Sequence, residues 1–225
     1  MNYQIWGGNL PAITLTLNKG EQLYTQSGGM TWMNDRFTMS TNMRGGVAKS
    51  FGRMFTGESL FMATYTATED GAQCTAAASF PGQILAFEID EGKELIAQKG
   101  AFLCATPGVV ISTAFSGLKS GLFGGEGFLL QRFSGKGIVF LEIDGSVKEI
   151  TLTPGEKYKV NTGNVAIFES GVQYSSEMVK GFKNVLFGGE GLFLSTVTGP
   201  GRVWLQTMSA ADLAGKLNGY IVRGS

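Results

Sequence analysis

The stretch Phe187-Gly-Gly-Glu-Gly-Leu-Phe-Leu194 decides how this chain is interpreted, because the same pattern occurs three times. The two earlier copies are Phe55-Thr-Gly-Glu-Ser-Leu-Phe-Met62 and Phe123-Gly-Gly-Glu-Gly-Phe-Leu-Leu130. Similar segments at a near-constant spacing are the signature of an internal repeat. The three copies therefore predict a protein built from internal repeats.

A second motif precedes each copy of the first and supports the same interpretation. Its three copies are Leu17–Leu23, Ile89–Leu95 and Leu152–Tyr158, and each contains a central glycine. Thirteen residues beyond that glycine lie Met33, Ala105 and Phe168, which suit a buried strand position. Two motifs in constant order predict one domain over 1–225, with repeats at about 12–82, 83–147 and 148–208.

The residues within each repeat indicate strands. Val139, Leu141 and Ile143 alternate with other residues, which is the period of a half-buried strand. Glycines punctuate the sequence every few residues, and the pairs Gly135/Gly137 and Gly199/Gly201 are predicted to form hairpin turns. Only 209–225 departs from this pattern, since Ser209 is the predicted N-cap of a short helix that is followed by a tail.

The composition narrows the classes of function. The 225 residues include 34 glycines and no histidine, and 18 basic residues balance 18 acidic ones. Without histidine there is no Ser-His-Asp triad, Cys-His pair or imidazole metal ligand. Zero net charge gives no electrostatic case for DNA or for an anionic membrane surface. No glycine pattern matches a nucleotide-binding loop, so we interpret the glycines as turn and packing positions.

The cysteines and the apolar runs indicate where the protein acts. Cys74 and Cys104 are surrounded by small or apolar residues, and we expect buried free thiols in a reducing compartment. No secretory signal is visible, and no apolar run reaches the length of a membrane helix. We therefore expect a cytoplasmic protein without a membrane span.

The third repeat also carries a family resemblance. The first motif at Phe187–Leu194, followed by Thr198-Gly-Pro-Gly-Arg-Val-Trp-Leu-Gln206, resembles the C-terminal signature of the altered inheritance of mitochondria protein 24 family. The resemblance implies an all-β, sandwich- or barrel-like domain of three related units with pseudo-threefold symmetry, similar to the tryptophan-operon RNA-binding attenuation protein. It supplies no catalytic residues. The first repeat departs from the pattern, since Ser59 replaces a glycine and Ala67–Gly71 forms a longer turn.

The repeated glutamates are one candidate site. Three carboxylates meeting on a threefold axis could hold a hard cation such as Ca²⁺ or Mg²⁺. The alternative, which we favour, is that each glutamate accepts hydrogen bonds at a turn. The residues that form this repeat signature are Gly57, Glu58, Gly125, Glu126, Gly127, Gly189, Glu190 and Gly191.

Basic residues between the two motifs are a second candidate site. Repetition could gather Lys49, Arg53, Lys119 and Lys183 at one end of the molecule as a face for an anion or a protein partner. Solvated loop charge is the simpler interpretation. Polyanion binding that survives the change of all three lysines to glutamate would exclude the face.

These observations favour a non-enzymatic cytoplasmic scaffold or interaction protein without a cofactor. Its partner is expected to be another protein or a second copy of itself, because exposed strand edges can pair with another chain. A module that binds RNA or another polyanion is the alternative, based on the resemblance of fold. A metal-binding or small-molecule-binding protein is the second alternative.

Overall fold

The computed structural model describes residues 1–26, 28–42, 62–117, 128–178, 193–218 and 220. These residues form antiparallel strands, one short α-helix and the 3-10 turns η1 (Lys99–Ala101) and η3 (Thr162–Asn164). The prediction of an all-β fold with a short C-terminal helix is therefore confirmed.

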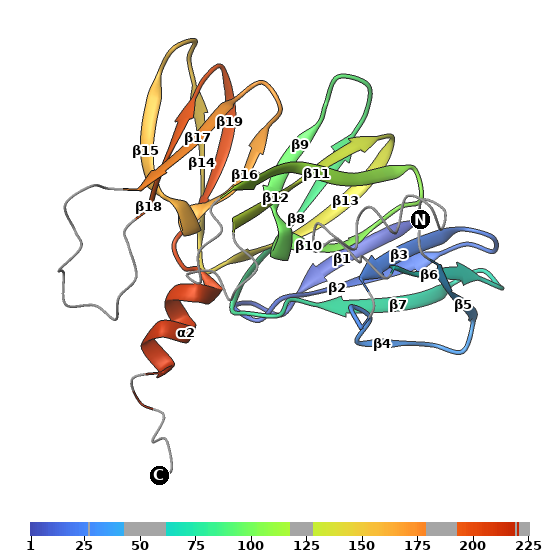
Figure 1. Ribbon diagram of the computed structural model, residues 1–225. Coiled ribbons are helices and arrows are strands. Elements are labelled where there is room, and N and C mark those ends of the chain that lie inside the picture. Colours follow the sequence, from blue (N-terminus) through green and yellow to red (C-terminus); the bar gives the residue numbers. More distant parts are fainter. Residues whose placement is uncertain (27, 43–61, 118–127, 179–192, 219, 221–225) are drawn as a thin grey trace.

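The strands form four antiparallel sheets, which are arranged like a fan (Figure 1). Sheet 1 has the order β1 (Asn2–Trp6), β2 (Ala12–Leu17), β7 (Ala72–Ala77), β4 (Trp32–Met33). Sheet 2 has the order β5 (Phe37–Asn42), β6 (Met62–Ala67), β3 (Gln22–Gln26), β10 (Phe102–Ala105), β13 (Gly137–Asp144), β8 (Gly82–Ile89). Sheet 3 has the order β11 (Val109–Gly117), β12 (Phe128–Gly135), β9 (Leu95–Gln98), β16 (Val165–Glu169), β19 (Gly201–Gln206), β14 (Val147–Leu152). Sheet 4 has the order β15 (Lys157–Asn161), β18 (Phe193–Thr198), β17 (Gln173–Met178).

The same pairing order recurs along the chain. In sheet 2, the trio β5-β6-β3 is joined to β10-β13-β8, which comes later in the sequence. In sheet 3, the trio β11-β12-β9 is joined in the same way to β16-β19-β14. The two joins, β3 with β10 and β9 with β16, are called the inner junctions below. The repeat boundaries and the threefold axis stay predictions.

The core consists of three apolar layers between neighbouring sheets. Phe140 lies between sheets 1 and 2, whereas Val139 and Leu141, on the other face of the same strand, lie between sheets 2 and 3. All three side chains are buried. The prediction of a half-buried strand is therefore wrong for β13, because sheet 2 has another sheet packed on each of its faces.

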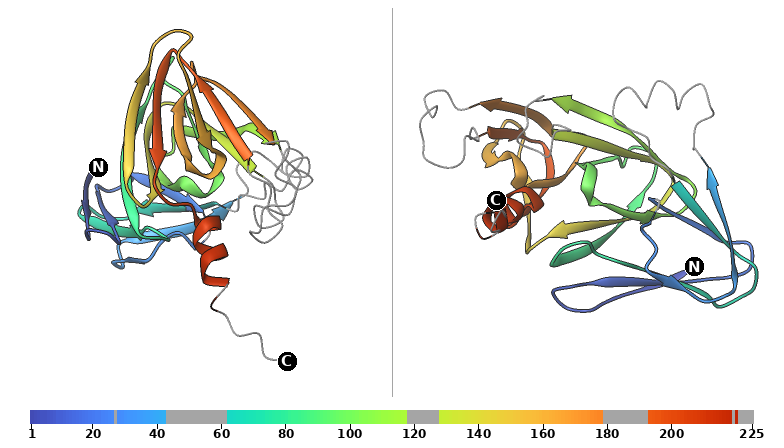
Figure 2. Two further views of the ribbon diagram at one scale, coloured as in Figure 1. Left: turned by 90° about the vertical axis from the view of Figure 1, so that its left-hand side faces the viewer. Right: turned by 60° about the horizontal axis from the view of Figure 1, so that its bottom comes forward.

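The predicted helix and turns are present. Helix α2 (Ala210–Asn218) begins after Ser209, whose Oγ accepts a hydrogen bond from the backbone N–H of Asp212 at 3.1 Å. This is the N-cap that the sequence predicted. Gly201, the first residue of β19 after the β18–β19 turn, has φ of +140°, a conformation that favours glycine. Figure 2 shows that α2 extends away from the sheets.

Both cysteines are buried and free, as predicted. Cys74 lies on β7 and Cys104 lies on β10, within the apolar layer between sheets 1 and 2. Burial raises the pKa of the Cys74 thiol to about 12 and raises the pKa of Cys104 as well. Both thiols are therefore protonated and unreactive in the folded chain at neutral pH.

Candidate functional site

The candidate residues singled out by the sequence all lie outside the described residues. These are the repeat signature with its possible cation ligands and the basic face: Gly57, Glu58, Gly125, Glu126, Gly127, Gly189, Glu190, Gly191, Lys49, Arg53, Lys119 and Lys183. Whether the three glutamates converge, and whether the basic residues share one face, stay predictions.

The described residues present a different candidate site, formed by two strand edges. Across the described ranges, β4 pairs only with β7, and β15 pairs only with β18. Their counterparts at the inner junctions pair on both sides: β10 and β16 match β4, whereas β3 and β9 match β15. An edge with unpaired backbone donors and acceptors can accept another strand. These two edges lie at opposite ends of the fan (Figure 1).

An exposed aromatic pair lies beside the β4 edge. The rings of Trp6 and Trp32 are 6.1 Å apart between centroids. Their exposed fractions are 42% and 52%, which is high for side chains of this size. The Trp6 indole N–H donates to Thr14 Oγ1 at 3.0 Å, and Thr14 shares a 2.9 Å hydrogen bond with Thr75. This arrangement holds one indole in place on the outer face of sheet 1.

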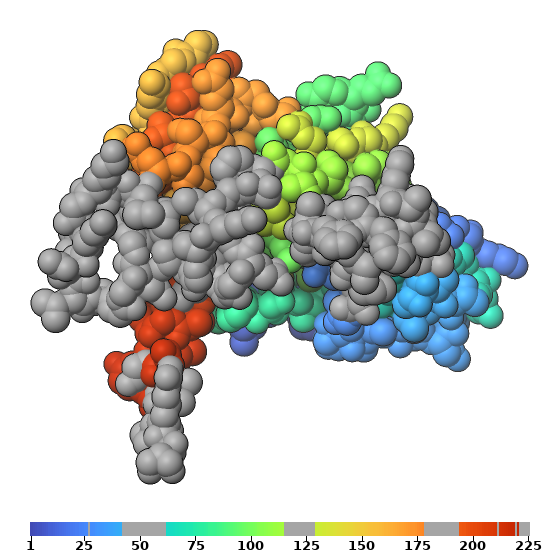
Figure 3. Space-filling model, in the orientation of Figure 1, coloured from blue at the N-terminus to red at the C-terminus, as the bar shows by residue number. Residues whose placement is uncertain are grey.

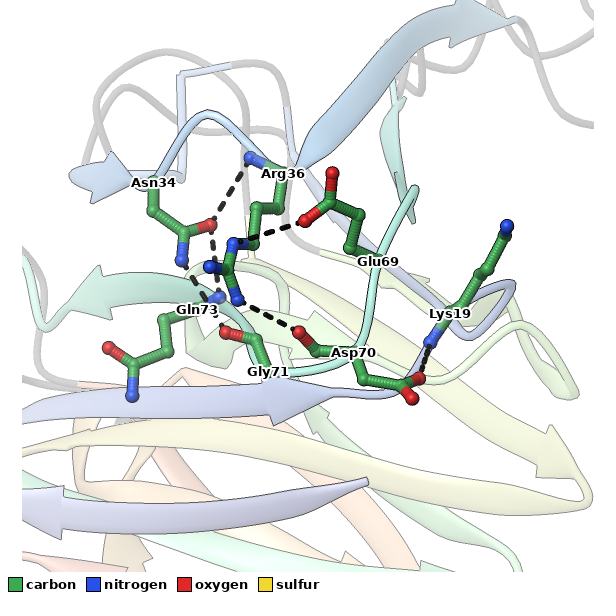
Figure 4. Close-up of polar contacts among 7 residues, drawn as sticks. All are labelled: Lys19, Asn34, Arg36, Glu69, Asp70, Gly71 and Gln73. Carbon is green, nitrogen blue, oxygen red and sulfur yellow. Dashed lines mark hydrogen bonds and ion pairs between the residues drawn. The ribbon is translucent and has the colours of Figure 1, made fainter.

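A polar cluster fixes the chain where it leaves β4 (Figure 4). The backbone N–H of Asn34 donates to the carbonyl of Gln73 at 3.0 Å, and Asn34 Oδ1 accepts from the N–H of Gln73 at 3.2 Å. Arg36 Nη1 donates to the carbonyl oxygen of Asp70 at 3.0 Å. The ion pair between Arg36 and Glu69, at 3.5 Å, is exposed and contributes little stability. The backbone contacts therefore do most to hold the short strand β4 in register with β7.

The β15 edge is more polar and carries positive charge. Lys157 and Lys159 are exposed, and Lys159 Nζ lies 3.4 Å from Glu177 Oε1 on β17. Val160, which follows Lys159 on β15, packs against the apolar layer between sheets 3 and 4. Tyr158 is 43% exposed. In the space-filling view, the blue strands of sheet 1 and the orange strands of sheet 4 lie on opposite sides of the molecule (Figure 3).

The burial of Met33 is where the sequence prediction fails in part. Ala105 and Phe168, the matching residues of the other repeats, are buried as predicted, whereas Met33 is only half-buried. Ala105 lies opposite Tyr24 and Phe168 lies opposite Ile96 across the inner junctions. Met33 has no strand on that side in the part of the chain that the structure describes. The first and last repeats of an array each lack one neighbour, which accounts for the lower burial at Met33.

Other kinds of site receive no support from the described residues. Among them, no group of three cysteine, aspartate or glutamate side chains lies close enough to hold a metal ion. Within the same residues, no helix has both the length and the apolar character needed to cross a membrane.

The fold places this chain in the class of all-β proteins built from stacked antiparallel sheets with a recurring strand order. The family described as mitochondrial biogenesis AIM24 matches residues 3–208, and the chain belongs to that family. The resemblance that the repeated motifs indicated is thereby confirmed.

Two streptococcal proteins are similar over nearly the whole chain. Uncharacterized protein M6_Spy0233 of Streptococcus pyogenes serotype M6 is 29% identical over 223 residues, which cover 96% of this chain and 88% of that protein. The crystal structure of protein SPYM3_0169 from Streptococcus pyogenes has a TM-score of 0.79 at 25% identity. That comparison covers 98% of this chain and 99% of the crystallised one.

Proposed function

We propose that this chain is a non-enzymatic scaffold or interaction protein that acts in the cytoplasm and binds a protein partner on the β4 side of sheet 1. The observation that carries the proposal is the exposed Trp6–Trp32 pair beside an unpaired strand edge. Exposed tryptophan is uncommon on surfaces that stay in water and enriched in those that bind proteins. Backbone pairing along β4 would add affinity, and pockets around the indoles would add specificity.

The free thiols support a reducing location. Cys74 and Cys104 both remain unpaired inside the core, which is typical of proteins that stay in the cytoplasm.

The proposal is tested by comparing captured partners between matched surface variants. The tagged wild type, a Trp6→Ala/Trp32→Ala variant and a Val110→Ala control would be used to capture proteins from the native host. Val110 is 54% exposed on β11, in another sheet. We expect wild type and control to retain the same partner and the tryptophan variant to lose at least nine-tenths of it. Equal recovery by all three variants would contradict the proposal.

A further inference from the structure

We propose that the partner of the β4 edge is a second copy of this chain, which docks through its β15 edge and continues the strand order of the inner junctions. This inference rests on the proposed function and names the partner of the same surface. The result is a head-to-tail contact between two different edges. Such a contact closes into a ring or continues as a filament, depending on the rotation between copies.

The inner junctions supply the register of this contact. The second motif aligns Gly20, Gly92 and Gly155. Counting from these glycines, the fourth residue pairs with the thirteenth residue of the next repeat at both inner junctions, as Tyr24 does with Ala105 and Ile96 with Phe168. The fifth pairs with the twelfth, as Thr25 does with Cys104 and Ala97 with Ile167.

Applying the same count to the two unpaired edges gives specific partners. The fourth and fifth residues after Gly155 are Lys159 and Val160, and the thirteenth and twelfth after Gly20 are Met33 and Trp32. In the proposed contact, Met33 of one copy therefore lies opposite Lys159 of the other. Trp32 lies opposite Val160.

The apolar surfaces at the β4 edge and the β15 edge are complementary in this register. The residues that match Trp32 at the inner junctions, Cys104 and Ile167, have no exposed surface, whereas Trp32 is 52% exposed. Val160 already packs at the border of the apolar layer between sheets 3 and 4. Residues directly opposite on antiparallel strands point to the same face of the sheet. Docking would therefore place the Trp32 indole over that layer and remove its apolar surface from water.

The charges at the two edges are complementary as well. Two residues beyond the pair of Met33 and Lys159, the same register places Asp35 opposite Lys157. At the inner junction of β9 and β16, the pairing already continues one residue further, to Glu169 and Leu95. Both Asp35 and Lys157 are exposed, and neither has an ion pair with another of the described residues. Opposite charges across two strands stabilise their pairing. A second copy thus supplies each of these charges with an opposite charge, which the described residues of its own chain do not.

The register is tested by disulfide cross-linking between two singly substituted full-length chains. We expect a mixture of Trp32→Cys and Val160→Cys to form a covalent dimer under mild oxidation. The matched control replaces Val160→Cys by Lys159→Cys, whose side chain points to the opposite face of the strand, and should give at least about tenfold less dimer. The native thiols do not compete, since both are buried.

A charge exchange tests the contact with Trp32 in place. We expect Lys157→Glu to weaken self-association about fivefold, as measured by light scattering, and Asp35→Lys in the same chain to restore it. The proposal would be overturned if the two mixtures gave equal amounts of covalent dimer, or if Trp32→Cys alone gave a dimer. It would also be overturned if no dimer formed and neither Lys157→Glu nor Asp35→Lys changed the strength of self-association. If those results accompany a different protein captured through Trp6 and Trp32, self-association fails while the proposed function stands. If nothing is captured, both fail.

Discussion

The inner junctions and the two end edges of this molecule are built from matching strands but have different surroundings. At the inner junctions, β10 and β16 have a strand on each side and apolar layers on both faces. At the ends, β4 and β15 have one neighbour each among the described strands, and their side chains are half-buried or exposed. The difference shows that burial in this fold depends on what the next repeat supplies. The same strand position is core in one repeat and surface in another.

The largest expected effect is on the free energy of unfolding, when one strand position is changed to alanine in sheet 2 and in sheet 1. Phe140 on β13 and Thr75 on β7 occupy the same position in matching strands. Each lies three residues after the first residue of its strand, which is Gly137 in β13 and Ala72 in β7. Phe140 is fully buried between sheets. We expect Phe140→Ala to lower the free energy of unfolding by about 3–5 kcal/mol and Thr75→Ala to lower it by about 1 kcal/mol, through the lost hydroxyl bond. Urea denaturation would measure both. A loss at Phe140 no larger than the loss at Thr75 would contradict the packing of Phe140 between two sheets.

A smaller effect is expected beside the β15 edge. Ser195, which lies opposite Val160, is fully buried, and its hydroxyl bonds Thr162 at 2.9 Å and Tyr174 at 2.6 Å. Ser195→Ala removes the shared partner and leaves the buried Thr162 hydroxyl without this bond. We expect a loss of about 1–3 kcal/mol in urea denaturation. Thr196→Ala, which changes an outward-facing residue of the same strand, is the control and should cost less than half as much.

The matching position of the second repeat is predicted to respond in the opposite direction. Gln131 on β12 lies opposite Ala97 of the neighbouring strand β9 and is fully buried. Neither atom of its amide has a hydrogen-bond partner in the part of the chain that the structure describes. Because an unsatisfied buried amide is costly, Gln131→Met should raise the free energy of unfolding by about 1 kcal/mol. A loss of stability would mean that the amide has an essential partner.

Ser209 was sufficient to predict the short helix, and the repeated motifs with their glycines were sufficient to predict the turns of an all-β fold. They also aligned Met33, Ala105 and Phe168, which lie in strands that occupy matching places. The sequence could not show that Phe140 and Val139 are buried on opposite faces of one strand, since a period of two residues predicts a single apolar face. It also gave no reason to single out Trp32 or Lys157. Their importance comes from the missing neighbour, which is a property of the assembled sheets.

The smallest expected effect concerns the end of β13, where Asp144 is hydrogen-bonded to the first residue of α2. Asp144 Oδ2 accepts from the N–H of Ala210 at 3.0 Å, and burial raises the pKa of the Asp144 carboxyl, although that hydrogen bond partly opposes the shift. A raised pKa means that the folded state holds the proton more tightly than the unfolded state. Its stabilising contribution is present below pH 3.8, the ordinary value, and is lost as pH rises through the folded-state pKa.

Asp144→Asn keeps an acceptor for Ala210 and removes the titration. We expect the variant to gain stability relative to the wild type as pH rises from 3.8 toward neutrality. Urea denaturation at a series of pH values would measure this. A difference that does not vary with pH would show that the carboxyl is solvated in the folded chain.

Association between the β4 edge and the β15 edge is tested by the mass of the wild-type protein in solution as its concentration is raised. We expect a mass that rises from 24.0 kDa toward multiples of it. We also expect Trp32→Glu to weaken the association at least about tenfold, because the exposed indole is the main apolar anchor. A mass that stays at 24.0 kDa at every concentration would contradict the claim that the two end edges bind one another.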